Sequence, residues 1–442
     1  MIMLNKLEMG KILRRWASNM NGLILITVFV ILLVTGIPVA LCLGISALVT
    51  IINMGLPAIT IAINAQAALS KAVLLAIPFF ILGGNIMDKS GISAKLIHLA
   101  SAFVGHIKGG LIIVCVLVAC FFAAISGSGP ATVAALGTII ILAMVSCGYS
   151  KETATGLTAT AGGIGLIIPP SISYVVIAPL AGISTGDLFL AGIIPGLVMG
   201  AALIIAGLWE NRRNKNITVL AKCSWQERMV AFKEAVWGLF MPVIILGGIY
   251  GGIFTATEAA AVSAIYGLIV GLLIYRSMTL KTLIEVCVTS AKQTAVVMFI
   301  IMCANLFAYA LTVTGACTIA SEFLLQFVGE SKFLFLLIVN ITFLIAGMLV
   351  DGNSAYYIFV PIMLPVAQRL GVDPIQLCVI MVMNIAIGLV TPPVGANLYT
   401  ACGITQLSFS KVSKACLPFL IASLCALAFV TYIPSLSLMI LG

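Results

Sequence analysis

Two short polar islands interrupt the apolar sequence of this chain, and both carry oxygen atoms suited to binding a cation. Residues 126–132 read SGSGPAT, and residues 351–357 read DGNSAYY. Hydroxyl, carboxylate and amide oxygens are the ligands that hard cations prefer, and glycine lets the backbone bend so that carbonyl oxygens can join them. The two islands therefore predict cation sites inside a hydrophobic protein.

Two helix-breaking phrases accompany the islands: GLIIPP at residues 165–170 and GLVTPP at residues 388–393, which lie 223 positions apart. Proline donates no N–H and excludes the carbonyl four residues before it, so each proline pair leaves two carbonyls without their helical donors. These carbonyls belong to Gly165, Leu166, Gly388 and Leu389. An unsatisfied polar group is costly in hydrocarbon, so the breaks predict a partner such as Na⁺.

The alternative explanation is that the prolines form packed kinks and the glycines and serines mediate close helix contacts. A single kink would favour that explanation. Two kinks, each accompanied by a polar island in the same order, favour two ion sites.

The composition places these features in a membrane. The chain has 442 residues, of which 62% are hydrophobic and only 8% charged, whereas about 25% of residues are charged in soluble domains. Apolar runs at residues 23–34, 235–250 and 333–350 are long and do not alternate with polar residues, which indicates helices rather than a β-barrel. We therefore expect an all-α polytopic membrane protein. The net charge of +9 comes from basic residues in loops, so no nucleic-acid partner is expected.

The sequence also contains two copies of one unit. The islands lie 225 positions apart, and the turns at residues 148–150 and 371–373 lie 223 apart. A near-constant spacing and a common order of such matches are typical of an internal repeat. We predict a basic N-terminal segment, a first repeat, a cytoplasmic linker and a second repeat, at residues 1–21, 22–208, 209–234 and 235–442.

Charge predicts that the two copies are inverted. Residues 88–108 carry three lysines against one aspartate, whereas the corresponding residues 322–332 carry one lysine against two glutamates. The linker has an excess of three positive charges and belongs in the cytoplasm. Corresponding segments thus prefer opposite sides, as in many secondary transporters. One observation conflicts with this topology: inversion puts the amino terminus outside, although residues 1–21 are basic. That segment is either an interfacial helix or marks a misplaced first crossing.

Each repeat is expected to contain three spanning helices, a surface-lying amphipathic segment, a re-entrant hairpin, a broken helix and a final helix. The first hairpin, residues 109–147, opens to the cytoplasm, and the second, residues 332–369, opens to the opposite side. The broken helices are residues 151–182 and 374–403. Each island would form a hairpin tip facing the break of its own repeat.

These motifs together resemble the large membrane subunit of tripartite ATP-independent periplasmic (TRAP) transporters. The resemblance rests on SGSGPAT, GLIIPPS, TATEAAAV, the D-G-N-S-A…P-I-M-L-P…G-V-D-P string and GLVTPPVGANLY, and it extends from about residue 36 to the C-terminus. It implies an ion-transporter-superfamily fold and elevator-type, Na⁺-coupled uptake of an organic acid across the bacterial inner membrane. Sialic acid, C4-dicarboxylates and sugar acids all remain open as substrates. It also implies a small four-helix membrane subunit, encoded separately, and a periplasmic substrate-binding protein.

The candidate ligands lie at the tips and breaks. For at least two Na⁺ sites they are Ser126, Ser128, Gly165, Ile168, Pro169, Gly347, Asp351, Asn353, Gly388, Thr391 and Val394. For the organic acid they are Ser128, Pro130, Thr132, Pro170, Ser171, Asn353, Pro393 and Asn397. The half-helices that follow the breaks would point their positive ends at the carboxylate.

Other functions fit the sequence less well. A channel or a different ion-coupled carrier would also use re-entrant loops, but paired inverted breaks suit alternating access. An intramembrane hydrolase would need a base near SGSG, and both histidines, His98 and His106, lie in the basic surface segment. We therefore do not expect an enzyme. Glu258, in TATEAAAV, is either an intramembrane functional carboxylate or a helix-capping acid, and its position favours the cap.

Overall fold

The computed structural model describes residues 20–214 and 216–441. The predicted basic segment 1–21 therefore lies outside the described residues, apart from its last two. Every regular element in the described residues is helical. Within residues 20–214 and 216–441, eight helices are long and apolar enough to cross a membrane, and a ninth crossing would arise from the pair Lys151–Ile167 and Ile172–Ala181, which bends by 42°. The prediction of an all-α polytopic membrane fold is confirmed.

The helices gather into two compact units that interleave along the chain. Unit 1 consists of Met1–Lys71, Ala295–Leu337 and Val350–Pro374, and unit 2 consists of Ala72–Thr294, Ile338–Leu349 and Ile375–Gly442. The boundaries after Lys71 and Thr294 are 223 residues apart, which is the spacing of the two proline phrases. The units do not follow the repeat limits, so the repeat limits stay a prediction.

Unit 1 contains the N-terminal helices and most of the second hairpin. Its elements are Met20–Val34, α2 (Val39–Asn53), α3 (Ile59–Leu69), the later part of α14 (Leu280–Val313), α15 (Ala316–Val328), the start of α16 (Lys332–Leu349) and α17 (Gly352–Arg369). The Lys332 ammonium donates to the Gly371 carbonyl at 3.1 Å, which joins the two outer ends of the hairpin formed by α16 and α17.

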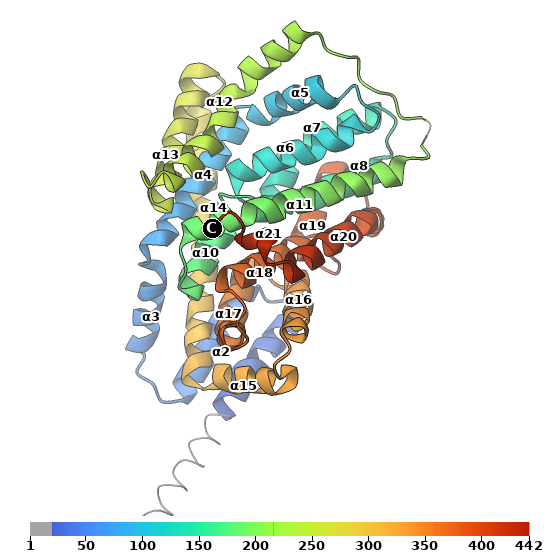
Figure 1. The fold of residues 1–442 in the computed structure, drawn as a ribbon. Helices are drawn as coiled ribbons and strands as arrows, with labels where there is room; N and C mark the ends of the chain where they lie inside the picture. Colours follow the sequence, from blue (N-terminus) through green and yellow to red (C-terminus); the bar gives the residue numbers. More distant parts are fainter. Residues whose placement is uncertain (1–19, 215, 442) are drawn as a thin grey trace, which may run out of the picture. The chain divides into compact units, whose positions relative to one another are not determined.

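Unit 2 contains the first hairpin and both broken helices (Figure 1). Its helices include α4 (Ala76–Lys89), α5 (Ile92–Val104), α6 (Gly110–Ser126), α7 (Gly129–Ser146), α8 (Lys151–Ala161), α9 (Ile164–Ile167), α10 (Ile172–Ala181), α11 (Thr185–Asn211), α12 (Trp225–Tyr250), α13 (Ala256–Ile269), α18 (Pro374–Gly388), α19 (Ala396–Thr405), α20 (Phe409–Tyr432) and α21 (Ser435–Leu438). Residues 376–388 of α18 are all buried. A helix that is apolar on every side belongs in the centre of a bundle.

The first hairpin turns at glycine. Gly127 ends α6 in the left-handed region, with φ 60°, and Pro130 occupies the first turn of α7, where its missing N–H costs nothing. At the other end of the hairpin, the backbone N–H groups of Leu220 and Thr218 donate to the carbonyls of Gly105 and Cys147 at 3.2 and 2.9 Å. The connection between α11 and α12 therefore lies at the open end of this hairpin, the end that charge assigns to the cytoplasm.

Two predicted elements differ from those observed. Of the predicted linker 209–234, only residues 212–224 lie outside the helices, because α11 continues to Asn211 and a capping box of Ser224 and Glu227 begins α12. The third spanning helix of the first repeat is interrupted. α3 ends at Leu69, and a 3₁₀ turn leads into α4 after the polar pair Ser70–Lys71. The corresponding α14 continues for 34 residues.

Glu258 is a capping residue. Its carboxylate accepts the backbone N–H of Thr255 at 2.8 Å, and the Thr255 hydroxyl oxygen accepts the backbone N–H of Glu258, which completes a capping box at the start of α13. The side chain is exposed. The preference for a capping role over a functional carboxylate is confirmed.

Candidate functional site

Three oxygen atoms converge at the tip of the first hairpin. The hydroxyls of Ser126 and Thr132 lie 3.1 Å apart, and the Thr132 hydroxyl donates to the Ser128 carbonyl at 2.8 Å. The Ser128 side chain makes no capping hydrogen bond, although Ser128 occupies the N-cap of α7. The Ser128 carbonyl also accepts the backbone N–H of Thr132 at 3.1 Å, whereas the hydroxyls of Ser126 and Thr132 each keep a lone pair with which they can bind a cation.

The first break packs directly on this tip. A Cβ atom added at Gly165 would lie 2.7 Å from the Thr132 hydroxyl oxygen and 2.9 Å from the Ser128 carbonyl oxygen. A Cβ atom at Gly127 would lie 2.7 Å from the Pro170 carbonyl oxygen. Glycine is required at both positions because real Cβ atoms do not approach so closely. The structure thus brings together Ser126, Ser128 and Gly165, predicted as Na⁺ ligands, and Thr132, predicted as a substrate residue.

The carbonyls at the breaks are not all left without donors. The Leu166 carbonyl accepts the Ser171 hydroxyl at 2.6 Å, and the carbonyls of Gly388 and Leu389 accept the backbone N–H groups of Thr391 and Asn397 at 3.0 Å each. The prediction of orphan carbonyls was wrong for these three, because the chain after each proline pair folds back and supplies a donor. A carbonyl oxygen has two lone pairs, so these groups can still contribute to a cation.

The second break is packed differently. A Cβ atom at Gly388 would lie 2.6 Å from the Cα and carbonyl carbon of Gly347, so the backbones of α18 and α16 are in contact. The Thr391 hydroxyl donates to the Ile387 carbonyl at 2.8 Å. Pro393 and Val394 are exposed, whereas Ile168, Pro169 and Pro170 of the first break are buried. In both breaks the bond between the two prolines is cis.

Asn397 of α19 contacts the first hairpin tip. A Cβ atom at Gly129 would lie 3.0 Å from the Asn397 side-chain oxygen, 2.8 Å from Leu166 and 3.0 Å from Leu389. The Asn397 amide nitrogen donates to the Ala159 carbonyl at 3.0 Å. Its oxygen is buried and has no hydrogen-bond partner within the part of the chain that the structure describes. An unpaired acceptor therefore lies next to the tip oxygens, where a ligand could supply the missing donor or positive charge.

The second tip belongs to unit 1. Asp351 caps α17, since its carboxylate accepts the backbone N–H of Ser354 at 3.0 Å and the Ser354 hydroxyl at 2.6 Å. Asn353 lies in the first turn of the same helix and is half-buried. Gly388 and Thr391 belong to unit 2, so a site shared by these four residues stays a prediction.

Sequence reasoning missed two groups of residues. The first is Gly129, which contacts Leu166 of the first break and Leu389 of the second. Two buried amides, Asn340 and Asn384, were also missed, although a polar side chain inside an apolar helix is by itself a signal of function in a membrane protein.

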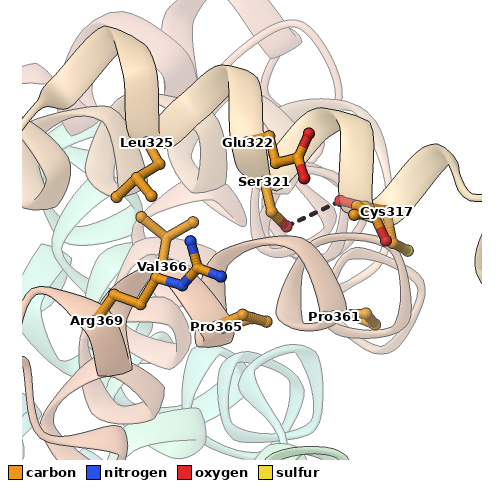
Figure 2. A pocket seen from close by; sticks show the side chains of 9 residues that line it. Cys317, Ser321, Glu322, Leu325, Pro361, Pro365, Val366 and Arg369 are labelled. Carbon is orange, nitrogen blue, oxygen red and sulfur yellow. Dashed lines mark hydrogen bonds between the residues drawn. The ribbon is translucent and has the colours of Figure 1, made fainter.

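Two cavities elsewhere fit an organic anion poorly. One, of about 160 Å³, lies between α15 and α17, and Figure 2 shows Glu322 and Arg369 on its opposite walls. Its walls carry one negative and one positive side chain, and its volume is below the 300 Å³ or more that is common for ligand sites. The other, of about 490 Å³, is lined by Asp187 at the start of α11 and by no lysine or arginine. The tip and breaks therefore remain the better candidate.

A family model described as "Tripartite ATP-independent periplasmic transporter, DctM component" matches residues 26–436. This match spans nearly the whole chain. The chain belongs to the DctM family of TRAP transporters. The family resemblance drawn from the tips and breaks is confirmed.

Several relatives agree with this assignment. The C4-dicarboxylate TRAP transporter large permease protein DctM of Rhodobacter capsulatus is 38% identical over 95% of this chain and 98% of its own length. The isethionate TRAP transporter permease protein DctMQ of Oleidesulfovibrio alaskensis is 39% identical over 94% of this chain, which matches 65% of that protein. Both relatives of this DctM chain are named as permease proteins of TRAP transporters.

A solved structure shares the fold. The YdaH transporter of Alcanivorax borkumensis superposes with a TM-score of 0.61 over 84% of this chain and 86% of its own, at 14% sequence identity. At that identity the likeness concerns the fold of the DctM chain alone.

Proposed function

We propose that this DctM chain is the transmembrane subunit that carries a small organic anion across the bacterial inner membrane, driven by Na⁺. The observation that supports this most is the contact of the first tip with the first break. There the Thr132 hydroxyl and the Ser128 carbonyl lie against Gly165 with no room for a side chain between them, and the Ser126 hydroxyl lies 3.1 Å from that of Thr132.

Na⁺ would bind where unwound backbone and hydroxyl oxygens meet. Such oxygens suit a hard monovalent ion, and discontinuous helices supply them in other secondary transporters. At the first site the ligands would be the tip hydroxyls and break carbonyls, because Ile168 offers no side-chain oxygen. At the second site Thr391 would add a hydroxyl to the Gly388 carbonyl.

The substrate class is a small organic anion. The named relatives carry C4-dicarboxylate and isethionate in their names, and both compounds are small acids. α10 begins after Ser171 and α19 after Gly395, so each break is followed by the positive end of a half-helix. Asn397 lies at the second of these ends, where its unpaired oxygen could accept a hydrogen bond from a substrate hydroxyl or share the Na⁺.

Transport would follow an elevator mechanism with two partners: a small four-helix membrane subunit and a periplasmic substrate-binding protein. The match to this chain covers 65% of the DctMQ relative, so that relative has room for a further component in the same chain. Tight packing around the breaks suits a part of the protein that moves without internal rearrangement.

The test is uptake into proteoliposomes that contain the complete complex. An inward Na⁺ gradient should drive accumulation of the acid, and K⁺ or Li⁺ should replace Na⁺ poorly. Full uptake in sodium-free medium, driven by a proton gradient, would refute the proposed coupling. Counterflow into preloaded vesicles should also be accelerated, as in a carrier, whereas a channel would show no such acceleration.

A further inference from the structure

A cluster of buried amide side chains joins three helices of unit 2, away from both tips. Asn384 lies on α18, Asn340 on α16 and Thr431 on α20, and none of them is more than 8% exposed. Polar side chains at such positions are rare inside membrane proteins, because each must find a partner there. The positions of the partners therefore indicate what the cluster does.

The hydrogen bonds of the cluster form a chain. The Asn384 amide nitrogen donates to the Asn340 side-chain oxygen at 2.8 Å and to the Ile380 carbonyl at 2.8 Å. The Asn340 amide nitrogen donates to the Thr431 hydroxyl at 3.1 Å. Gln376, two turns earlier on α18, donates to the Thr431 carbonyl at 3.0 Å. The amide orientation of Asn384 follows from these bonds, since its nitrogen faces two acceptors.

The Asn340–Asn384 bond lies close to the second break. Asn384 is four residues, or about one helical turn, before Gly388. Along α16, Asn340 is two turns before Gly347, whose backbone contacts Gly388. The same two helices are thus joined twice, by the amide pair and by the two glycines, and the second contact is where α18 unwinds.

Two glycines in contact have no side chains to hold them in register. Backbone packing at Gly347 and Gly388 allows α16 to slide along α18, whereas a hydrogen bond between two buried amides fixes one position. In the first repeat, the corresponding helices α6 and α8 are joined by a weaker contact, with the Cys115 thiol 3.6 Å from the Thr158 hydroxyl. The position of the first break is set instead by the contact of Gly165 with Ser128 and Thr132 at the first hairpin tip.

We propose that Asn340 and Asn384 are positioning residues for the second cation site, because their hydrogen bond sets the place of the Gly388 carbonyl. This inference rests on the proposed Na⁺ coupling. Asn340 and Asn384 act through the contact between α16 and α18 and touch neither Na⁺ nor substrate. Removing it should weaken sodium binding more than substrate binding.

The test uses the complete complex in proteoliposomes and compares three variants. Asn340→Leu removes the bonds to Asn384 and to Thr431. Asn340→Asp keeps an acceptor for the Asn384 amide, and the Thr431 hydroxyl can rotate to donate to it. Gln376→Leu is the matched control, because it removes a bond of the same cluster 12 residues before Gly388.

Asn340→Leu should raise the sodium concentration for half-maximal uptake about fivefold, the factor expected for one lost hydrogen bond. The KM for the acid at saturating sodium should stay within twofold. Asn340→Asp should restore the wild-type sodium dependence, and Gln376→Leu should lower thermal stability with the sodium dependence unchanged. If Asn340→Leu fails to fold, Thr431→Val is used instead. It removes the bond between Asn340 and the Thr431 hydroxyl and keeps the bond between Asn340 and Asn384, and it should still raise the half-maximal sodium concentration measurably.

Three results would overturn the inference. An unchanged half-maximal sodium concentration in folded Asn340→Leu, or in Thr431→Val where that variant replaces it, would make the cluster a scaffold contact only. An equal shift in Gln376→Leu would show that any loss of stability has the same effect. Sodium-independent uptake by the wild-type complex would overturn both the coupling and this inference, whereas sodium-dependent wild-type uptake with an unaffected Asn340→Leu would overturn the inference alone.

Discussion

Gly163, just before the first break, and Ala386, just before the second, lie in contact: a Cβ atom at Gly163 would come within 2.9 Å of the Ala386 carbonyl oxygen. The two residues are 223 positions apart, the spacing of the two proline phrases, so they occupy corresponding places in the two copies. Corresponding residues meet near the axis that relates two copies. The breaks are therefore packed against each other where the predicted twofold axis would run.

Replacing Gly165 by alanine should abolish uptake. The new methyl group would lie 2.7 Å from the Thr132 hydroxyl oxygen, so the tip must move away from the break, and such overpacking costs about 1–3 kcal/mol. Gly403→Ala is the control, since nothing lies within 4 Å of that position. Uptake at matched protein amounts is the measurement, and normal uptake by Gly165→Ala would argue against a site between tip and break.

Thr391→Val should raise the half-maximal sodium concentration about tenfold, because one ligand interaction of about 1.4 kcal/mol corresponds to that factor. The substitution keeps the shape of the side chain and removes its hydroxyl group. In the wild-type chain this hydroxyl donates to the Ile387 carbonyl, which leaves the lone pairs of its oxygen free for a cation. Ile168→Val, at the corresponding place in the first break, should leave the half-maximal sodium concentration nearly unchanged. An unchanged sodium dependence in Thr391→Val would remove Thr391 from the site.

Asn397→Leu should weaken substrate uptake. It removes the unpaired oxygen beside Gly129 and the hydrogen bond to Ala159, so we expect the KM for the acid to rise about fivefold or more. Asn211→Leu is the control, since the Asn211 amide nitrogen donates to the Gly207 carbonyl of its own helix. Equal KM values for the two variants would assign Asn397 to packing.

Inverted topology can be tested by cysteine labelling in intact cells. A membrane-impermeant thiol reagent added outside should label a cysteine placed at Glu330 and miss one placed at Lys222, because their charge environments assign them to opposite faces. Both positions are exposed. The signal is read against the unmodified chain, which has exposed Cys287 and Cys425 of its own. Labelling of both new cysteines from outside would contradict the inversion.

The sequence was sufficient for features that depend on local chemistry. Proline pairs and glycine tips have fixed effects on a helix, so the breaks at residues 168–171 and 389–395 and the turn at Gly127 could be placed without coordinates. The cap formed by Glu258 follows from spacing alone. For the same reason the oxygens at the first tip were identified correctly as neighbours of the first break.

Features that depend on an irregular backbone path or on distant segments could not be placed from the sequence. The donors for the carbonyls of Gly388 and Leu389 come from the fold-back of residues 391–397, whose path no local rule predicts. The amide pair of Asn340 and Asn384 joins residues 44 positions apart, and only the packing of α16 on α18 brings them together. The interruption near Lys71 was missed because the apolar pattern continues on both sides of it.

The segment between the two copies is bonded to both outer ends of the first hairpin, through Leu220 to Gly105 and through Thr218 to Cys147. Two separately expressed halves, each with intact helices, would therefore not be equivalent to the whole chain if the cut removed residues 218–220. A split placed after residue 221 would keep the donors and acceptors of these bonds on the first fragment, whereas a split before residue 214 would put the donors on the second fragment and leave the acceptors on the first. The same bonds make this segment a poor place for an inserted tag or reporter domain, even though it is a surface loop.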